Sequence, residues 1–192
     1  MNNKATYKGR ILFNPENLTK KHKNQANWKY MAIIVIDGDV ADYYQWFVKK
    51  RYDIELETPI RGAHVSFIND SDRDIAKGLN IPADSDEIDI RWKELENKWN
   101  GKEINITVDV DAKTSTDHWW LIVLEDEREE MHNIRAEIGL GRPFFGLHMT
   151  IGKAINRRPK VDNVDSNGVK ALKMNLEQSE YIHNLIKKGL IE

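Results

Sequence analysis

The chain has 192 residues, of which 40% are hydrophobic, and its 29 basic and 31 acidic residues leave a net charge of −2. This length suits one globular domain, and the nearly balanced charge argues against binding of long nucleic acid, which needs many phosphate contacts. The absence of Cys excludes disulfides and thiol catalysis, and the chain shows neither a signal-peptide core nor an apolar run long enough for a membrane. We therefore expect a cytoplasmic protein, without membrane contact, that binds at most a small anionic ligand.

The first half of the sequence alternates between the two-residue period of strands and the 3.6-residue period of helices. These periods predict strands at 9–13, 30–37 and 61–68 and helices at 40–51 and 86–99. A polar stretch rich in Lys and Asn, 14–29, predicts a loop. The half therefore contains a complete strand–helix–strand unit.

The second half repeats this order. Its patterns predict strands at 103–110, 118–125 and 145–152, a helix at 127–138, a polar loop bounded by Pro159 and Gly168, and a closing helix at about 176–188. Strand 118–125 matches strand 30–37 at an offset of 88 residues. We therefore expect a single domain over 1–192 that contains two pseudo-repeats, at about 30–100 and 103–155.

One six-residue phrase ends both repeats. It reads Gly62-Ala-His64-Val-Ser66-Phe and then, 84 residues later, Gly146-Leu-His148-Met-Thr150-Ile. Because successive strand residues point to opposite faces, the Gly, His and hydroxyl residues share one face and the apolar residues share the other. Gly152 falls on the histidine face by the same parity. A glycine before each histidine suits a ligand that lies close to the backbone, so both glycines are candidates for substrate binding.

Two imidazoles and two hydroxyls suit the cleavage of a phosphodiester without a metal. Of His64 and His148, one takes a proton from the attacking hydroxyl or water and the other gives a proton to the leaving oxygen. Ser66 and Thr150 are expected to donate hydrogen bonds to the nonbridging phosphate oxygens. The repeat makes the histidines nearly equivalent, so the choice of acid and base stays open.

A structural role and a metal site are the alternatives for these histidines. A single His on a strand is usually a surface or a satisfied core residue, but two matching phrases in two repeats favour a shared function. A zinc site needs a third ligand of His, Cys or carboxylate type, and neither phrase contains a carboxylate. We therefore expect no metal and no cofactor.

Residues beside the phrases are further candidates for substrate binding. Arg61 and Lys153 flank the phrases and could contact a phosphate, although strand parity turns them away from the histidine face unless the strand has ended. Trp119 and Trp120 are adjacent on a strand and point to opposite faces, so one of them could stack on a base. Of the two, Trp119 is the candidate for stacking on a base of the substrate.

The two His-x-Ser/Thr motifs, their spacing and the repeated strand–helix–strand order resemble the 2H phosphoesterase superfamily, over about residues 30–151. The resemblance implies an α+β fold with two lobes of antiparallel sheet, helices outside and a central cleft. It also implies that His64 and His148 are the catalytic pair, that Ser66 and Thr150 bind phosphate, and that the reaction needs no metal. Ser66 departs from the more common Thr, and the pattern accepts both.

Within this superfamily, several branches remain as alternatives. One is similar to RNA ligase/cyclic phosphodiesterase proteins that act on 2′,3′-cyclic or 2′,5′ linkages at RNA ends. Another is the phage group of anti-CBASS nucleases, which degrade cyclic oligonucleotide signals of bacterial immunity. The low net charge favours a small cyclic or 2′,5′-linked nucleotide as substrate over polymeric RNA. A nucleotide-binding sponge without catalysis and a metal-dependent hydrolase are the rival functions.

Overall fold

The strands form one antiparallel sheet. The computed structural model describes residues 4–15, 29–59, 61–115, 117–124, 128–143, 146–155 and 170–171. Its strands are β1 (Lys4–Phe13), β2 (Met31–Ile36), β3 (Leu56–Glu57), β4 (His64–Asn69), β5 (Glu103–Asp109), β6 (Lys113–Ser115), β7 (His118–Ile122), β8 (His148–Ala154) and β9 (Lys170–Ala171). They pair in the order β5-β1-β2-β4-β8-β7-β6-β9, and β3 pairs with β8 off this path.

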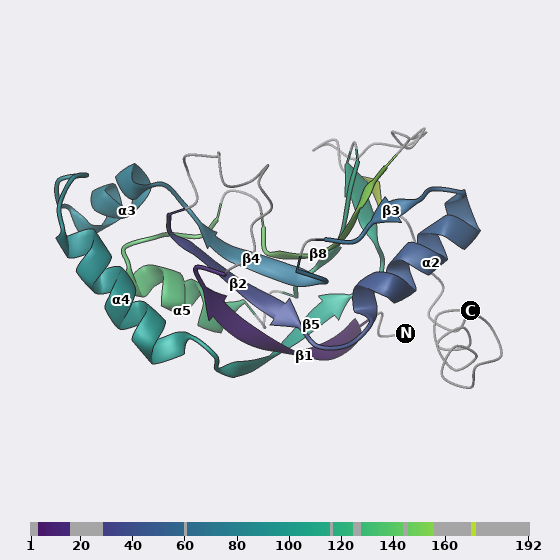
Figure 1. Ribbon diagram of the computed structural model, residues 1–192, viewed down its shortest axis with the longest axis horizontal. Coiled ribbons are helices and arrows are strands. Elements are labelled where there is room, and N and C mark those ends of the chain that lie inside the picture. Colours follow the sequence, from purple (N-terminus) through teal and green to yellow (C-terminus); the bar gives the residue numbers. More distant parts are fainter. Residues whose placement is uncertain are drawn as a thin grey trace.

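The sheet curls, as Figure 1 shows. An isolated antiparallel bridge joins Val108 of β5 to Val123, just after β7, although β5 and β7 are far apart in the pairing order. Both residues are fully buried. The fold is therefore α+β, with an antiparallel sheet that curls into a half-barrel around an apolar core.

Helices pack on this sheet from both ends. They are α2 (Val40–Tyr52), α3 (Asp72–Leu79), α4 (Glu87–Trp99) and α5 (Glu129–Glu137). Figure 1 places α3, α4 and α5 at one end of the sheet and α2 at the other. Helix α2 contacts β8, α4 contacts β1, and α5 contacts β4.

Aromatic side chains form much of the contact between α4 and the sheet. The ring of Trp92 on α4 lies 5.0 Å from that of Phe13 and 5.2 Å from that of Tyr30, centroid to centroid, in edge-on arrangements that aromatic pairs prefer. Phe13 in turn contacts Phe67 of β4 at 6.5 Å. The apolar side of β4 is therefore buried.

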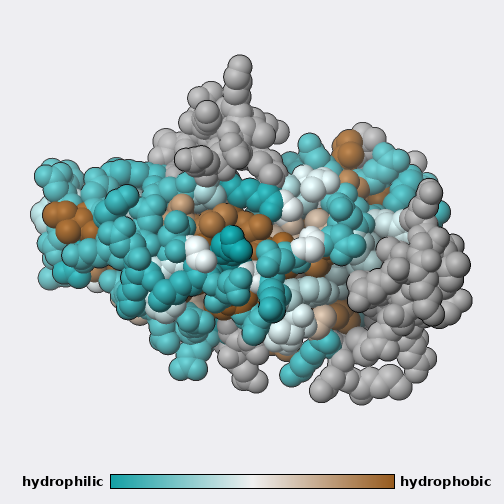
Figure 2. All heavy atoms as spheres, turned by 60° about the horizontal axis from the view of Figure 1, so that its bottom comes forward, coloured by the Kyte–Doolittle hydropathy of each residue, from teal (hydrophilic) through white to brown (hydrophobic). Residues whose placement is uncertain are grey.

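The surface seen in Figure 2 is largely hydrophilic, and apolar side chains show mainly near its middle. Among the described residues, the large hydrophobic side chains that stay exposed are those of Ile90 and Ile155. None of the described helices is long and apolar enough to cross a membrane.

The two repeats agree residue by residue in their strand pairing. In the first, β2 pairs with β4 as Ile33–Ser66, Ile34–Val65 and Val35–His64; in the second, β7 pairs with β8 as Trp120–Thr150, Leu121–Met149 and Ile122–His148. The offset is 84 residues for the phrase strands, as expected. It is 87 residues for the partner strands, so the predicted offset of 88 was wrong by one residue.

Each repeat also contains a β-bulge at the same place. The register shifts between Ala32 and Ile33 in the first repeat and between Trp119 and Trp120 in the second. On the phrase strand, the extra residue follows Ser66 in one case and Thr150 in the other. A bulge changes which face the later residues of a strand occupy, so the parity expected from the sequence fails beyond both hydroxyls.

Most predicted elements are confirmed, with shifted ends. The strands predicted at 61–68 and 145–152 are β4 and β8, which begin at their histidines, and the helices predicted at 40–51, 86–99 and 127–138 are α2, α4 and α5. Helix α3 was not predicted. The predicted closing helix at 176–188 and the loop after Pro159 lie outside the described residues.

Helix α3 has clear end signals. Ser71 and Asp74 form a capping box, in which the Ser71 side chain accepts from the Asp74 backbone N–H and the Asp74 side chain accepts from the Ser71 backbone N–H. Asn80 ends the helix in a left-handed conformation.

The pairing of β4 with β8 joins the two repeats. These strands lie side by side in the middle of the sheet, antiparallel, with Val65 opposite Met149. The described strands thus form one continuous sheet, and a division into two lobes is not seen in its pairing order.

Candidate active site

The two phrase strands separate polar and apolar residues as expected. Val65 and Phe67 on β4 and Met149 and Ile151 on β8 are buried. His64, Ser66, His148 and Thr150, which alternate with them, are all partly exposed. The four residues with candidate chemistry therefore occupy the face of the sheet opposite the core.

The register places these four residues in two cross-strand pairs. His64 lies directly opposite Thr150. The same register, extended by one residue, sets Ser66 opposite His148. Directly opposed residues have Cβ atoms about 4.5–5.5 Å apart, so each histidine is next to the hydroxyl of the other repeat. We call these four candidate catalytic residues the catalytic quartet.

The glycine of each phrase orients the histidine that follows it. Nδ1 of His64 lies 3.0 Å from the carbonyl oxygen of Gly62, and Nδ1 of His148 lies 2.9 Å from that of Gly146. A carbonyl oxygen only accepts, so Nδ1 carries the proton in both rings and Nε2 has the lone pair in the neutral form. Both Nε2 atoms are therefore left to exchange protons with a ligand.

Burial favours the neutral form of both histidines. The pKa of His64 is lowered from its ordinary value of 6.5 mainly by burial, with smaller contributions from the positive charges of Arg61 and His148, while the Gly62 carbonyl opposes this shift. Burial likewise lowers the pKa of His148, helped by His118 and opposed by the Gly146 carbonyl. The mutual effect of the two imidazoles disfavours protonation of both at once.

The bulge after Thr150 returns Lys153 to the face of the catalytic quartet. Lys153 pairs with His118, Gly152 pairs with Trp119, and Thr150 pairs with Trp120. His118 and Trp120 share a face of β7, so Lys153 and Thr150 share that face too, and the Lys153 side chain is exposed. Its Nζ lies 3.4 Å from a carboxylate oxygen of Asp117.

Gly152 does not lie on the histidine face, because the bulge turns it toward the core. A Cβ atom at Gly152 would lie 2.9 Å from side-chain atoms of Leu56, which is buried. This corrects the prediction that Gly152 shares a face with His148 and Thr150. The glycine gives β3 room to cross beside β8.

Arg61 comes just before the first phrase and interacts electrostatically with His64. Its guanidinium Nη2 donates to the carbonyl oxygen of Pro15 at 2.9 Å, and burial lowers its pKa. Arg61 thus binds the backbone just after β1 and places a positive charge near His64.

Trp119 lies in the core, fully buried, with its ring 5.9 Å from that of Tyr52 on α2. Trp120 is the one of the adjacent pair that shares the face of the catalytic quartet. Its ring lies 5.7 Å from that of His148, at an interplanar angle of 58°. The candidate for stacking on a base therefore moves from Trp119 to Trp120, because Trp119 is on the opposite, helix-covered face.

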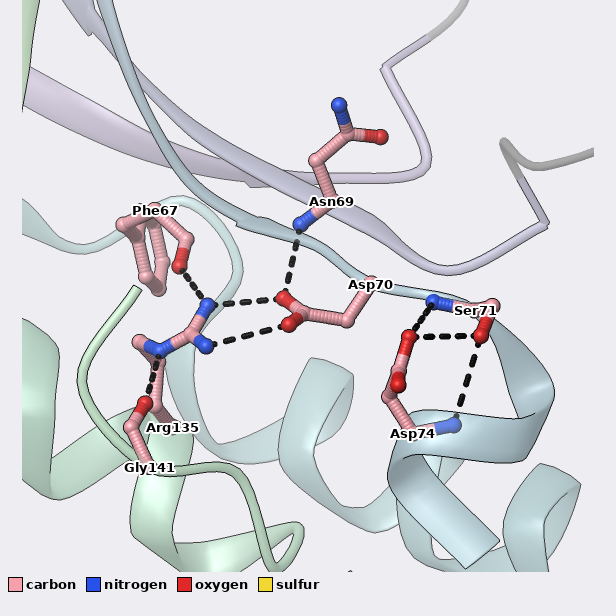
Figure 3. Close-up of polar contacts among 7 residues, drawn as sticks. All are labelled: Phe67, Asn69, Asp70, Ser71, Asp74, Arg135 and Gly141. Carbon is pink, nitrogen blue, oxygen red and sulfur yellow. Dashed lines mark hydrogen bonds and ion pairs between the residues drawn. The ribbon is translucent and has the colours of Figure 1, made fainter. Parts of the chain in front are cut away.

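A buried arginine from the second repeat holds the first phrase strand (Figure 3). Arg135 of α5 is 3% exposed, and its Nη1 donates to the Phe67 carbonyl at 2.6 Å and to Asp70 at 2.7 Å. Its Nη2 also donates to Asp70, and its Nε donates to the carbonyl of Gly141. Phe67 is the extra residue of the bulge after Ser66, so this clamp supports the backbone next to the quartet.

The sequence reasoning missed Arg135 and Asp70. Arg135 lies in the charged stretch of a predicted helix, and nothing in its spacing distinguishes it from a solvated residue. Among the described residues, no group of three or more His, Cys, Asp or Glu is arranged to hold a metal ion.

Comparison with known proteins adds no further information. No family model, no curated protein and no solved structure matches the chain. Any assignment of function therefore rests on the geometry of the catalytic quartet.

Proposed function

We propose that the protein is a metal-independent phosphodiesterase of the 2H type that cleaves a small nucleotide. The observation that carries this proposal is the cross-strand arrangement of His64 with Thr150, and of Ser66 with His148 by the same register. It gives one phosphate two imidazoles and two hydroxyl donors at neighbouring positions. We also propose that the two repeats, whose strand registers are equivalent, act as two lobes of this one sheet on either side of the paired phrase strands.

In the proposed reaction, one neutral imidazole takes a proton through Nε2 from the attacking oxygen. This oxygen, either the 2′-hydroxyl of the substrate or a water, bonds to phosphorus as the bond to the leaving oxygen breaks. The other imidazole, protonated at Nε2, gives its proton to the leaving oxygen, and general acid–base catalysis of this kind contributes about 10²–10⁴-fold. Ser66 and Thr150 donate to the nonbridging oxygens, where charge develops.

The electrostatics of the site fit an anionic substrate. Both histidines are held toward the neutral form in the free protein, and a bound phosphodiester anion would favour protonation of one of them. Binding of the substrate thus favours the protonated imidazole that acts as the general acid. Only one imidazole needs to gain a proton, in agreement with the mutual repulsion of two imidazolium ions.

The proposed substrate is a cyclic di- or oligonucleotide or a 2′,5′-linked or 2′,3′-cyclic nucleotide, consistent with degradation of a host defence signal by a phage protein acting in the cytoplasm. The second candidate is a 2′,3′-cyclic phosphodiesterase for RNA ends. The third is a sponge that binds the nucleotide without cleaving it, which would not need the oriented Nε2 atoms.

The test is a turnover assay with a panel of cyclic dinucleotides, cyclic trinucleotides, 2′,5′-oligoadenylate and 2′,3′-cyclic nucleotides, with and without EDTA. We expect turnover that resists EDTA and falls by about 10²–10⁴-fold in His64→Ala and in His148→Ala. His118→Ala is the matched control, because this histidine is exposed, lies outside the quartet and affects His148 only through its charge, so turnover should change far less than in either quartet variant.

Three results would contradict the proposal. Turnover that EDTA abolishes would indicate a metal-dependent hydrolase. Tight binding without turnover would indicate a sponge. Equal losses in His118→Ala and His64→Ala would show that the quartet has no special role.

A further inference from the structure

The catalytic quartet is symmetric, but the strands that flank it are not. Ile33 on β2 lies opposite Ser66, and Trp120 on β7, which occupies the equivalent position of the second repeat, lies opposite Thr150. Ile33 is fully buried, whereas Trp120 is partly exposed. Only the β7 side of the quartet therefore offers an accessible aromatic surface at this position.

The indole of Trp120 lies next to the reacting groups. Its centroid is 5.7 Å from that of the His148 ring, and its cross-strand partner is Thr150. Neighbouring strands are about 4.8 Å apart, so a phosphate held by Thr150 and a planar group on Trp120 would occupy adjacent positions. A nucleotide joins a phosphate to a planar base through its ribose.

The two tryptophans of β7 lie on opposite faces of the sheet, one in the core and one on the polar face. Trp119 fills the core against α2 and makes the packing contribution expected of a large aromatic residue. Trp120 stays on the polar face beside two residues of the quartet, where its partly exposed ring contributes nothing to the packing of the core. Stacking of a base on an aromatic side chain stabilises binding by about 1–3 kcal/mol and tolerates any base.

We propose that Trp120 is the stacking platform for a nucleobase of the substrate, so that the nucleoside next to the scissile phosphate lies on the β7 side of the paired histidines. This inference rests on the proposed function. It narrows the substrate class to phosphodiesters that carry a base next to the reacting phosphate. It also fixes how the substrate lies in the pseudo-symmetric site, because the buried Ile33 offers no equivalent stacking surface on the β2 side.

The test measures binding in the His64→Ala background, where cleavage is suppressed, by isothermal titration calorimetry. The probes are adenosine 2′,3′-cyclic phosphate and its base-free counterpart, 1-O-methylribose 2′,3′-cyclic phosphate. Trp120→Leu should weaken binding of the adenosine probe by about 5- to 150-fold, which corresponds to the loss of one stacked base. Trp120→Phe should retain most of this affinity, and the base-free probe should bind equally to all variants.

Trp99→Leu is the matched control, since Trp99 lies on α4 with its Nε1 donating to Glu137. It should leave binding of both probes unchanged. A loss in Trp120→Leu that is equal for the two probes would overturn the platform and assign Trp120 to the packing of His148. Unchanged binding of the adenosine probe to Trp120→Leu, or no binding of this probe in the His64→Ala background, would overturn it too.

The platform and the proposed function fail in different ways. If the wild-type protein cleaves no nucleotide but binding depends on both Trp120 and the base, the phosphodiesterase proposal fails and the platform stands. If the wild-type protein cleaves both probes with equal kcat/KM, the platform fails and the phosphodiesterase proposal stands.

Discussion

Nδ1 of His64 lies 3.0 Å from the carbonyl oxygen of Gly62, two residues earlier in the same chain. The second repeat reproduces this contact between His148 and Gly146. The imidazoles are thus oriented by the backbone of their own phrase and do not depend on an acidic side chain. The residue two positions before each histidine therefore takes part in the site through its backbone carbonyl.

The two glycines differ in backbone conformation, and this difference predicts different responses to alanine. Gly62 has φ +68°, a left-handed conformation in which an L residue costs about 1–2 kcal/mol, although a Cβ there would meet nothing within 4 Å. Gly62→Ala should therefore lower the free energy of unfolding by about 1 kcal/mol and reduce turnover, because the carbonyl that orients His64 shifts.

Gly146→Ala is the matched control for this prediction. Its Cβ would lie 4.0 Å from Nη1 of Arg128, an ordinary contact, and its backbone is not left-handed. Stability should change little in a urea unfolding experiment. An equal destabilisation of both variants would contradict the conformational explanation.

The pH dependence of activity follows from the lowered pKa values of His64 and His148. Catalysis needs one neutral and one protonated imidazole, so kcat/KM, which reports the free protein, should be bell-shaped with its maximum below pH 6.5. The maximum of kcat should lie at higher pH, because a bound phosphodiester anion raises the pKa of the imidazoles. A kcat/KM that keeps rising through pH 8 would contradict the His/His mechanism.

The same pKa shifts predict how stability depends on pH. Because the folded state lowers the pKa of both histidines below 6.5, the unfolded state binds more protons in acid. Their effect on the free energy of unfolding is absent well above pH 6.5 and becomes destabilising as the pH falls through this value. The double variant His64→Asn/His148→Asn should lose part of this pH dependence between pH 7 and 5 in urea unfolding, and an unchanged slope would show that burial does not perturb the two imidazoles.

The clamp around Arg135 should contribute strongly to stability. Arg135→Leu would remove the cationic partner of Asp70 and a donor to the Phe67 carbonyl. Breaking a buried ion pair from one side costs about 3–5 kcal/mol, and the lower end is expected because the Asp70 side chain is 24% exposed. The exposed pair of Lys98 and Glu137 serves as the control, and Lys98→Ala should cost less than about 1 kcal/mol. Similar unfolding midpoints for these two variants would argue against the clamp.

The close approach of Gly78 to Gly139 predicts that alanine at position 78 destabilises the protein, although alanine usually stabilises a helix. Alanine normally stabilises a helix interior by about 1 kcal/mol relative to glycine. In α3, however, a Cβ at Gly78 would lie 1.9 Å from the Gly139 carbonyl oxygen, so Gly78→Ala should lower the melting temperature. Gly141→Ala, whose Cβ would meet nothing within 4 Å, should leave it nearly unchanged, and a rise in the melting temperature of Gly78→Ala would contradict the close approach.

Hydrophobic periodicity predicted the buried and exposed faces correctly along the regular parts of the strands. Alternation in the phrases correctly predicted that Val65 and Met149 are buried and that His64 and His148 share the other face. The repeat was visible because its two copies retain both the motif and the order of the elements. Helix α3 was missed because it has only eight residues, half of them charged. Its capping box is the one sequence signal that indicates it.

The bulges mark where sequence reasoning stopped working. The extra residues, Phe67 and Ile151, are apolar at positions where simple alternation also expects an apolar residue, so the sequence shows no break in pattern. Their consequences nevertheless shape the surroundings of the site, because Gly152 turns inward and Lys153 turns outward. The choice of Trp120 over Trp119 depends instead on the register of β7 against β8, which places Trp120 opposite Thr150 and beside His148. Such geometry depends on strand pairing across the sheet, which no local window contains.

The pairing of β4 with β8 has a consequence for how the proposed site forms during folding. Val65 and Met149, which pair across these strands, are 84 residues apart in sequence, and closing so long a loop delays pairing during folding. A folding intermediate with one ordered repeat would carry one imidazole and one hydroxyl. Under the proposed function, activity during refolding should therefore appear only when β4 and β8 have paired, and the recovery of turnover would report the formation of this contact.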